Sequence, residues 1–262
     1  MKLEETRAIV TGAARGLGRR FALALAEAGA RVAAGDIDRA GLRTLKAEAE
    51  GLPGTVTVAG LDIADEESVT QFFAAVDEPL GGANVLINNA GVLRDGLLVS
   101  GEGKEARKLP SIQWRSVLDV NLTGQFLMAR EFVHRLVERG AERGVSPGRP
   151  AVIVNLSSLA RSGNAGQSSY SSSKAGLDAA TRTWALELAH HGIRVGGVAP
   201  GVIDTPILEG ISGEAMEKLR AGIPLGRLGQ PEEVWLAVRF ILECDFFTGR
   251  TIEVDGGAVL GV

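Results

Sequence analysis

Short apolar runs alternate with longer amphipathic stretches along the whole chain. The apolar runs are nearly continuous rather than interrupted at every second residue, which is typical of strands covered on both faces. Because strand-like and helix-like stretches alternate, we expect right-handed crossovers and a doubly wound parallel sheet with helices on both faces. Seven runs are predicted as strands: Arg7–Thr11, Arg31–Asp36, Val56–Leu61, Val85–Asn88, Ala151–Ser157, Arg194–Ala199 and Thr251–Val254.

The stretches between the predicted strands have helical spacing. One helix is predicted to end at Gly29, a residue suited to a C-cap, and another to begin after Asp65, a suitable N-cap. No linker, repeat or low-complexity tract divides the chain, so residues 1–262 are predicted to form one α/β domain. The apolar faces of these two helices are Leu17, Phe21, Ala24, Leu25 and Ala28, and Val69, Phe72, Phe73 and Val76.

Two segments depart from this alternation. Residues Ser100–Ser111 are polar and charged and predict a surface excursion. Residues Ile203–Pro224 follow the sixth strand and predict a flap over a substrate. Its apolar side chains fit an acyl pocket and packing against the body equally well. They are Ile207, Leu208, Ile211, Met216, Leu219 and Ile223.

Composition excludes several classes of function. The net charge of −4 and the absence of any Lys/Arg run longer than a pair argue against nucleic acid as a partner. No apolar run reaches the roughly 18 residues that cross a bilayer, and a strand predicted almost at once after Met1 leaves no room for a signal peptide. Cys244 is the sole cysteine, and the three histidines lack ligand spacing, so we expect no disulfide, no metal and a cytoplasmic protein.

A glycine-rich turn follows the first predicted strand. Gly12, Gly16 and Gly18 permit a tight turn in which backbone N–H groups approach a pyrophosphate at the helix N-terminus. Asp36 ends the second strand, where a carboxylate accepts hydrogen bonds from the adenosine ribose and repels a 2′-phosphate. Arg15 argues the other way, because a guanidinium pairs with that phosphate. We favour NAD(H) over NADP(H), since Asp36 meets the 2′ group most directly.

Two further strands end in polar residues at the same expected edge of the sheet. Asp62, followed by Ile63, is placed to accept a hydrogen bond from the adenine amino group, and a helix cap is an equally good interpretation. The run Asn88-Asn89-Ala90-Gly91 ends the fourth strand and, taken alone, would also suit an ordinary turn.

Tyr170 is the only tyrosine, and Lys174 lies four residues later. In a helix the two side chains share a face. Bringing a phenol from a pKa near 10 to about 7 takes roughly 4 kcal/mol. A cation about 4 Å away at an effective dielectric of about 20 supplies a similar amount. The pair therefore predicts a proton-transfer group that works near neutral pH.

Together these motifs resemble the short-chain dehydrogenase/reductase superfamily, in family order and over nearly the whole chain. The closest likeness is to the β-ketoacyl carrier-protein reductases, with a further likeness to 3-hydroxyacyl-CoA dehydrogenases in the excursion at Ser100–Ser111. The resemblance implies a Rossmann-type fold, NAD(P) and a homotetramer. It also implies interconversion of a ketone and a secondary alcohol, most closely on a 3-oxoacyl thioester. The closer likeness lies in Arg94–Leu98, Gly163–Gln167 and Thr248–Arg250.

Four catalytic roles follow from the resemblance. Tyr170 would protonate the carbonyl oxygen, Lys174 would lower the Tyr170 pKa and bind the nicotinamide ribose, and Asn121 would hold a water linked to Lys174. A serine would orient the carbonyl. Counting back from Tyr170 gives Ser157, whereas matching the strand end gives Ser158. We choose Ser158, because loops lose residues more easily than strands change register.

The resemblance also implies a cofactor-binding set. The alternatives are a dehydrogenase of a sugar, steroid or aryl alcohol, or a weakly catalytic dinucleotide-binding regulator, against which the intact catalytic set argues. The residues do not fix the substrate, the direction or the stereochemistry. The predicted cofactor-binding residues are Gly12, Arg15, Gly16, Leu17, Gly18, Asp36, Asp62, Ile63, Asn89, Ala90, Gly91, Tyr170, Lys174, Pro200, Gly201, Ile203 and Thr205.

Overall fold

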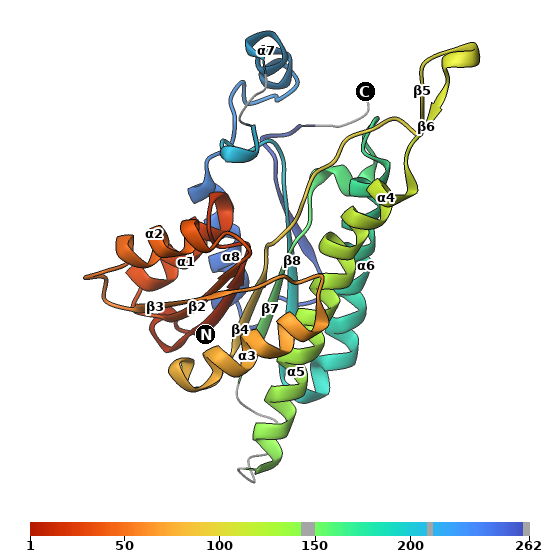
Figure 1. The fold of residues 1–262 in the computed structure, drawn as a ribbon. Coiled ribbons are helices and arrows are strands. Elements are labelled where there is room, and N and C mark those ends of the chain that lie inside the picture. Colours follow the sequence, from red (N-terminus) through yellow and green to blue (C-terminus); the bar gives the residue numbers. More distant parts are fainter. Residues whose placement is uncertain (143–149, 209–211, 259–262) are drawn as a thin grey trace.

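A seven-stranded sheet, parallel throughout, lies at the centre of the computed structural model, which describes residues 1–142, 150–208 and 212–258 (Figure 1). Its strand order is β3-β2-β1-β4-β7-β8-β9. The predicted single-domain α/β fold of the Rossmann type is therefore confirmed. The strands are β1 (Arg7–Thr11), β2 (Arg31–Asp36), β3 (Thr55–Gly60), β4 (Val85–Asn88), β7 (Ala151–Leu156), β8 (Ile193–Pro200) and β9 (Thr251–Val254).

Helices cover both faces of the sheet (Figure 1). On one face, buried side chains such as Phe21 and Ile241 pack against the strands, and on the other Phe72 and Phe132 do so. The first layer is α1 (Gly16–Glu27), α2 (Arg39–Glu48) and α8 (Pro231–Glu243), and the second includes α3 (Glu66–Leu80), α5 (Gln125–Glu142) and α6 (Ser168–Leu188).

The apolar pattern located the strands closely. The predicted bounds of β1, β2, β4 and β9 match the structure. Those of β7 differ by one residue at one end, and those of β3 and β8 differ by one residue at both ends. Asp65 is the N-cap of α3 and accepts from the Glu67 amide at 3.0 Å, as predicted. The C-cap of α1 is Ala28 rather than Gly29. Gly29 comes next with a φ of +86°, because the chain leaves the helix through the left-handed region that glycine favours.

The order of the strands determines where a ligand can bind. β1 pairs with β2 on one side and with β4 on the other, so the direction of winding reverses between β1 and β4. In open parallel sheets ligands bind beyond the carboxyl ends of the strands at such a reversal. The glycine-rich turn after β1 and the turn after β4 both lie at this edge.

The two irregular segments take different forms. In the first, β5 (Val99–Ser100) and β6 (Arg107–Lys108) pair antiparallel as a hairpin that projects from the body, with a 3₁₀ turn at Gly103–Glu105 (Figure 1). Nearly all residues of the segment predicted as a surface excursion are exposed. It leads into α4 (Ser111–Leu118).

The predicted flap contains a 3₁₀ turn at Pro206–Leu208 and α7 (Gly213–Ala221). Leu208, Met216 and Ile223 pack in one cluster with Leu228 and Ala258, so these apolar side chains contact the rest of the chain. Ile211, another apolar residue of the predicted flap, lies outside the described residues. No helix in the described ranges has the length and apolarity needed to cross a membrane.

Candidate active site

The glycine-rich turn packs tightly against the turn that follows β4. A Cβ on Gly12, whose φ is +64°, would lie 2.7 Å from the Cα of Ala90. A Cβ on Gly18 would lie 2.2 Å from the carbonyl oxygen of Gly12. Both distances are below normal contact, so these positions require glycine for close backbone approach.

Hydrogen bonds tie the two turns together. The Thr11 hydroxyl accepts from the amides of Asn89 and Ala90, both at 3.0 Å. In return the Asn89 side chain donates to the carbonyls of Thr11 at 2.9 Å and Gly12 at 3.2 Å. The structure thus brings the predicted residues of these two motifs into one rigid edge.

The carboxylate of Asp36 lies against the same turn. Its two oxygens accept from the amides of Ala14 at 3.0 Å and Asp38 at 2.9 Å. A carboxylate has about four acceptor positions, so capacity remains for ribose hydroxyls. Arg15, the N-cap of α1, is exposed and makes no side-chain capping bond, which leaves the first amides of α1 (Gly16 and Leu17 among them) open to an anion. These residues fit a dinucleotide.

Asp62 and Ile63 occupy the turn after β3. Asp62 is exposed, and its carboxylate accepts from the Ala64 amide at 2.9 Å, whereas Asp65 caps α3. Ile63 is buried, and a Cβ on Gly124 would lie 2.8 Å from its side chain.

The segment after β8 approaches the glycine-rich turn from the other side. Gly201 donates its amide to Val254 at 2.9 Å, and Ile203 forms a bridge with Gly229. A Cβ on Gly16 would lie 3.8 Å from the Cβ of Thr205. Thr205 therefore lies close to the glycine-rich turn, and Pro200 ends the strand that leads there.

Lys174 is buried on α6 with its ammonium held by one carbonyl. Its Nζ donates to the carbonyl oxygen of Leu156, the last residue of β7, at 2.6 Å. The side chain is 4% exposed, and burial lowers the pKa of Lys174 to about 8. The buried Ser157 hydroxyl donates to the Lys174 carbonyl at 3.2 Å and so fixes the same turn of α6.

Ser158, unlike Ser157, lies beside the phenol of Tyr170 and hydrogen-bonds to it. The Ser158 oxygen also accepts from the Ala160 amide at 3.1 Å. The structure thus separates the two serines that the sequence left in competition, with Ser157 directed at backbone and Ser158 at Tyr170.

The predicted direction of the Tyr170 pKa shift is wrong. Burial raises the pKa of Tyr170, although the residue is only partly buried as a whole; the bond to Ser158 lowers it and the charge of Asp95 raises it. The Lys174 ammonium lies 5.7 Å from the centroid of the phenol ring and is directed to Leu156. Desolvation is therefore the largest cause of the shift, and the phenol is protonated at neutral pH.

Asn121 lies in a π-helical turn, Asp119–Gly124, between α4 and α5. Its side chain accepts from the Val92 amide at 2.7 Å and donates to the Val92 carbonyl at 2.8 Å. A Cβ on Gly91 would lie 3.3 Å from the Asn121 oxygen and 3.7 Å from Lys174 Nζ. The structure therefore brings Asn121, Gly91 and Lys174 together. Single-turn π-helices occur frequently at functional sites.

The sequence reading missed a buried polar network beneath this edge. The Asn88 amide donates to Asn155 at 3.0 Å, and Asn155 donates to the Thr181 hydroxyl at 2.9 Å. Gln125 donates to the Ala90 carbonyl. The available signal was two asparagines inside otherwise apolar strands, since a buried polar side chain needs a partner.

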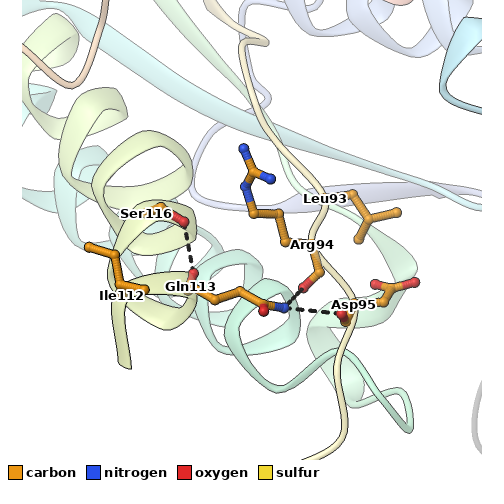
Figure 2. Close-up of a pocket in the computed structure, with 6 residues that line it drawn as sticks. All are labelled: Leu93, Arg94, Asp95, Ile112, Gln113 and Ser116. Carbon is orange, nitrogen blue, oxygen red and sulfur yellow. Dashed lines mark hydrogen bonds between the residues drawn. The ribbon is translucent and has the colours of Figure 1, made fainter. Parts of the chain in front are cut away.

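An open cavity of about 540 Å³ lies between the segment that follows β4 and the start of α4 (Figure 2). One of its lining residues, Asp95, is close enough to Tyr170 for its charge to raise the pKa of that phenol. The Gln113 side chain donates to the carbonyls of Arg94 at 3.3 Å and Asp95 at 3.0 Å, so it fixes the wall of the cavity (Figure 2). The amide of Gly96 donates to Gly166 at 2.7 Å, just before α6. The lining residues are Leu93, Arg94, Asp95, Ile112, Gln113 and Ser116.

Comparisons with known proteins agree with this geometry. Residues 12–259 match the family model described as "Enoyl-(Acyl carrier protein) reductase". The chain is 40% identical over 263 residues to the 3-oxoacyl-[acyl-carrier-protein] reductase of Thermotoga maritima, with 99% of this chain and 100% of that protein covered.

Solved structures share the fold. A short-chain type dehydrogenase/reductase from Mycobacterium marinum superposes with a TM-score of 0.87 at 30% identity, covering 98% of this chain and 96% of the other. The 3-ketoacyl-(acyl-carrier-protein) reductase from Brucella melitensis complexed with NADH superposes with a TM-score of 0.85 at 28% identity. The match covers 97% of this chain and 98% of the other.

Burial of Lys174 predicts a dependence of stability on pH. Below pH 8 the lysine is charged in both the folded and the unfolded protein, so the full desolvation cost is present. Between a folded pKa of about 8 and the ordinary value of 10.5, the unfolded chain binds more protons, so stability rises with pH. Relative to Lys174→Met, the wild type should gain up to roughly 3 kcal/mol, at about 1.36 kcal/mol per unit.

Urea unfolding of both proteins at neutral pH and near pH 10 measures this difference, because every other titrating group is common to both. Parallel pH dependence of the two unfolding free energies would contradict a depressed pKa for Lys174.

Proposed function

The chain belongs to the short-chain dehydrogenase/reductase family, and from this premise we propose that it reduces the ketone of a 3-oxoacyl thioester to a secondary alcohol with a nicotinamide cofactor. The observation that carries the proposal is the pair of hydroxyls, Ser158 and Tyr170, hydrogen-bonded to each other beside the buried ammonium of Lys174. Two adjacent hydroxyl donors suit a carbonyl oxygen, which accepts two hydrogen bonds.

Each residue has a distinct role in this proposal. Tyr170 donates its proton to the carbonyl oxygen, and its raised pKa keeps that proton in place until the oxygen becomes basic. Ser158 orients the carbonyl. Lys174 and Asn121 hold the nicotinamide ribose side of the site and link it to solvent through a water on Asn121. The cofactor supplies the hydride when bound.

A phenol held protonated favours the reductive direction at neutral pH. Alcohol oxidation needs Tyr170 as a base, and burial makes its deprotonation costly. Oxidation should therefore be faster in alkaline solution.

The cofactor proposed is NAD(H) in preference to NADP(H). Asp36 supports this choice, because its carboxylate lies against the glycine-rich turn where a 2′-phosphate would meet a like charge. The predicted cofactor-binding residues are proposed to form one binding site. Residues 1–262 are proposed to form a single cofactor-binding domain. Arg15 is exposed and free to contact the adenosine side.

The assembly and location are also proposals. A homo-oligomer, with a tetramer as the expected form, is supported by the family resemblance. A cytoplasmic location is supported by a sole cysteine, Cys244, that has no disulfide partner. Sugar, steroid and aryl alcohols remain alternative substrates, because this scaffold serves many specificities.

Replacing the acid tests the reaction. Tyr170→Phe should lower kcat for NADH-dependent reduction of an acetoacetyl thioester by at least about 100-fold, because a general acid contributes roughly 10²–10⁴-fold. NADH affinity, measured by fluorescence titration, should be unchanged. A crotonyl thioester is the control substrate: turnover of its C=C bond in place of the ketone would contradict the proposed chemistry, as would full activity of the variant.

The two neighbouring serines form a matched pair for the second test. Ser158→Ala should lower kcat/KM by about 10²-fold, because it removes a donor to the carbonyl oxygen. Ser157→Ala should reduce kcat/KM much less, because Ser157 bonds only to the Lys174 backbone. The reverse order of the two losses would assign the catalytic role to Ser157.

Removing the carboxylate tests the choice of cofactor. Wild-type kcat/KM should be higher with NADH than with NADPH, and Asp36→Ala should lower the ratio at least about tenfold, because a repulsion of about 1.4 kcal/mol is lost. Glu78→Ala is the control, since this exposed carboxylate on α3 lies outside the proposed cofactor-binding set. A wild-type preference for NADPH, or a ratio unchanged in Asp36→Ala, would count against this role.

A further inference from the structure

The hairpin beside the cavity carries cations that the rest of the chain does not neutralise. Arg107 and Lys108 form β6, and Arg94 lines the cavity itself. In the described part of the chain, none of these three side chains forms an ion pair or a hydrogen bond. Arg130 and Arg227, elsewhere on the surface, each pair with a glutamate.

The charge is unevenly distributed along the hairpin. Lys108 lies opposite Val99 and Arg107 opposite Ser100, so its paired strands carry positive charge alone. The acidic residues of the hairpin, Glu102 and Glu105, lie in the connection between the strands, beyond the paired residues. In a chain of net charge −4 the paired strands are therefore a local positive site next to the cavity.

The same region exposes apolar side chains in succession. Leu97, Leu98 and Val99 are 55%, 70% and 55% exposed, and Ile112 at the start of α4 is 73% exposed. These exposed apolar side chains follow one another directly where the segment enters the hairpin. An isolated two-stranded hairpin is marginally stable in water. An apolar centre edged by charge is the usual anatomy of a protein interface.

Given the proposed reduction of a 3-oxoacyl thioester, on which this step rests, we propose that the β5–β6 hairpin docks an acidic carrier protein bearing the acyl group. Charge complementarity to Arg107 and Lys108 selects an acidic partner, and the run of exposed apolar side chains beside them selects a folded protein over a small cofactor. The Gly96–Gly166 hydrogen bond joins the start of the hairpin segment to the turn before α6, which carries Tyr170. A carrier docked there lies at the mouth of the cavity.

The test compares two charge-reversed variants. R107E/K108E alters the docking site, whereas R43E/K46E reverses two exposed cations on α2, in the opposite helix layer (Figure 1). Each is assayed with an acetoacetyl group on an acidic acyl carrier protein, on coenzyme A and on N-acetylcysteamine. Binding of the acyl carrier protein is also measured directly by calorimetry.

R107E/K108E should raise KM for the carrier-bound substrate at least about tenfold and weaken carrier binding to match, with kcat unchanged. KM for the other two thioesters should change less than about twofold, since neither presents an acidic protein surface. Raising salt from about 50 to about 300 mM should move the wild-type KM toward that of the variant. R43E/K46E should behave as wild type.

An equal rise in KM for the coenzyme A thioester would assign the cations to its phosphates, and unchanged carrier binding would remove the docking role. A changed oligomeric state in R107E/K108E would place the hairpin between copies of this chain; each of these results overturns the proposal. If the wild type binds the carrier, R107E/K108E does not, and no thioester is reduced, the docking proposal is supported and the proposed reaction is overturned. The docking proposal and the proposed reaction can therefore fail independently.

Discussion

A buried ammonium held by a single backbone carbonyl is the interaction on which the candidate site depends. Lys174 Nζ donates a hydrogen bond to the carbonyl oxygen of Leu156 at the end of β7. This bond fixes the position of α6 relative to the edge of the sheet. Burying a cation without a carboxylate costs free energy, which is why the pKa of Lys174 falls to about 8. Packing of the two apolar layers on the sheet offsets that cost.

The surroundings of Lys174 and Tyr170 disfavour the charged form of each side chain. Burial lowers the pKa of Lys174 and raises the pKa of Tyr170. In the ground state the phenol is therefore neutral. When its proton moves to a carbonyl oxygen, the phenolate that forms lies next to an ammonium, and the attraction between them appears only as the proton leaves. Stabilisation that grows along the reaction lowers the barrier, whereas stabilisation already present in the ground state does not.

The sequence predicted the strands and the motifs, which depend on residue type. It predicted less well the features that depend on the three-dimensional environment of a residue. The strands were located because both faces are covered, which leaves nearly continuous apolar runs. Gly12, Gly18 and Asn89 were identified because their motifs fall after strands of one parallel sheet. The π-helical turn at Asn121 leaves no pattern in residue order, because it shifts hydrogen bonds rather than side-chain types. The sign of the Tyr170 shift depends on burial, which spacing alone cannot measure.

The choice between Ser157 and Ser158 shows the same limit at the scale of one residue. Adjacent residues of extended backbone face opposite sides, and these two serines directly follow β7. Ser157 therefore contacts the Lys174 backbone, whereas Ser158 contacts Tyr170. A count along the chain that is wrong by one residue selects the wrong serine. Strand register resolves what sequence counting cannot.

The proposed catalytic groups and the proposed docking hairpin lie in separate parts of this molecule. Lys174 is bonded to the backbone at the end of β7, and Thr11 and Asn89 bond the ends of β1 and β4 to each other, so a shift at this edge would break several hydrogen bonds at once. A hydrogen bond between Gly96 and Gly166 joins the start of the hairpin segment to that edge, and the β5–β6 hairpin projects from the body of the molecule (Figure 1). Changes in its length or charge can therefore alter which partner presents the substrate while the positions of Ser158, Tyr170 and Lys174 stay fixed.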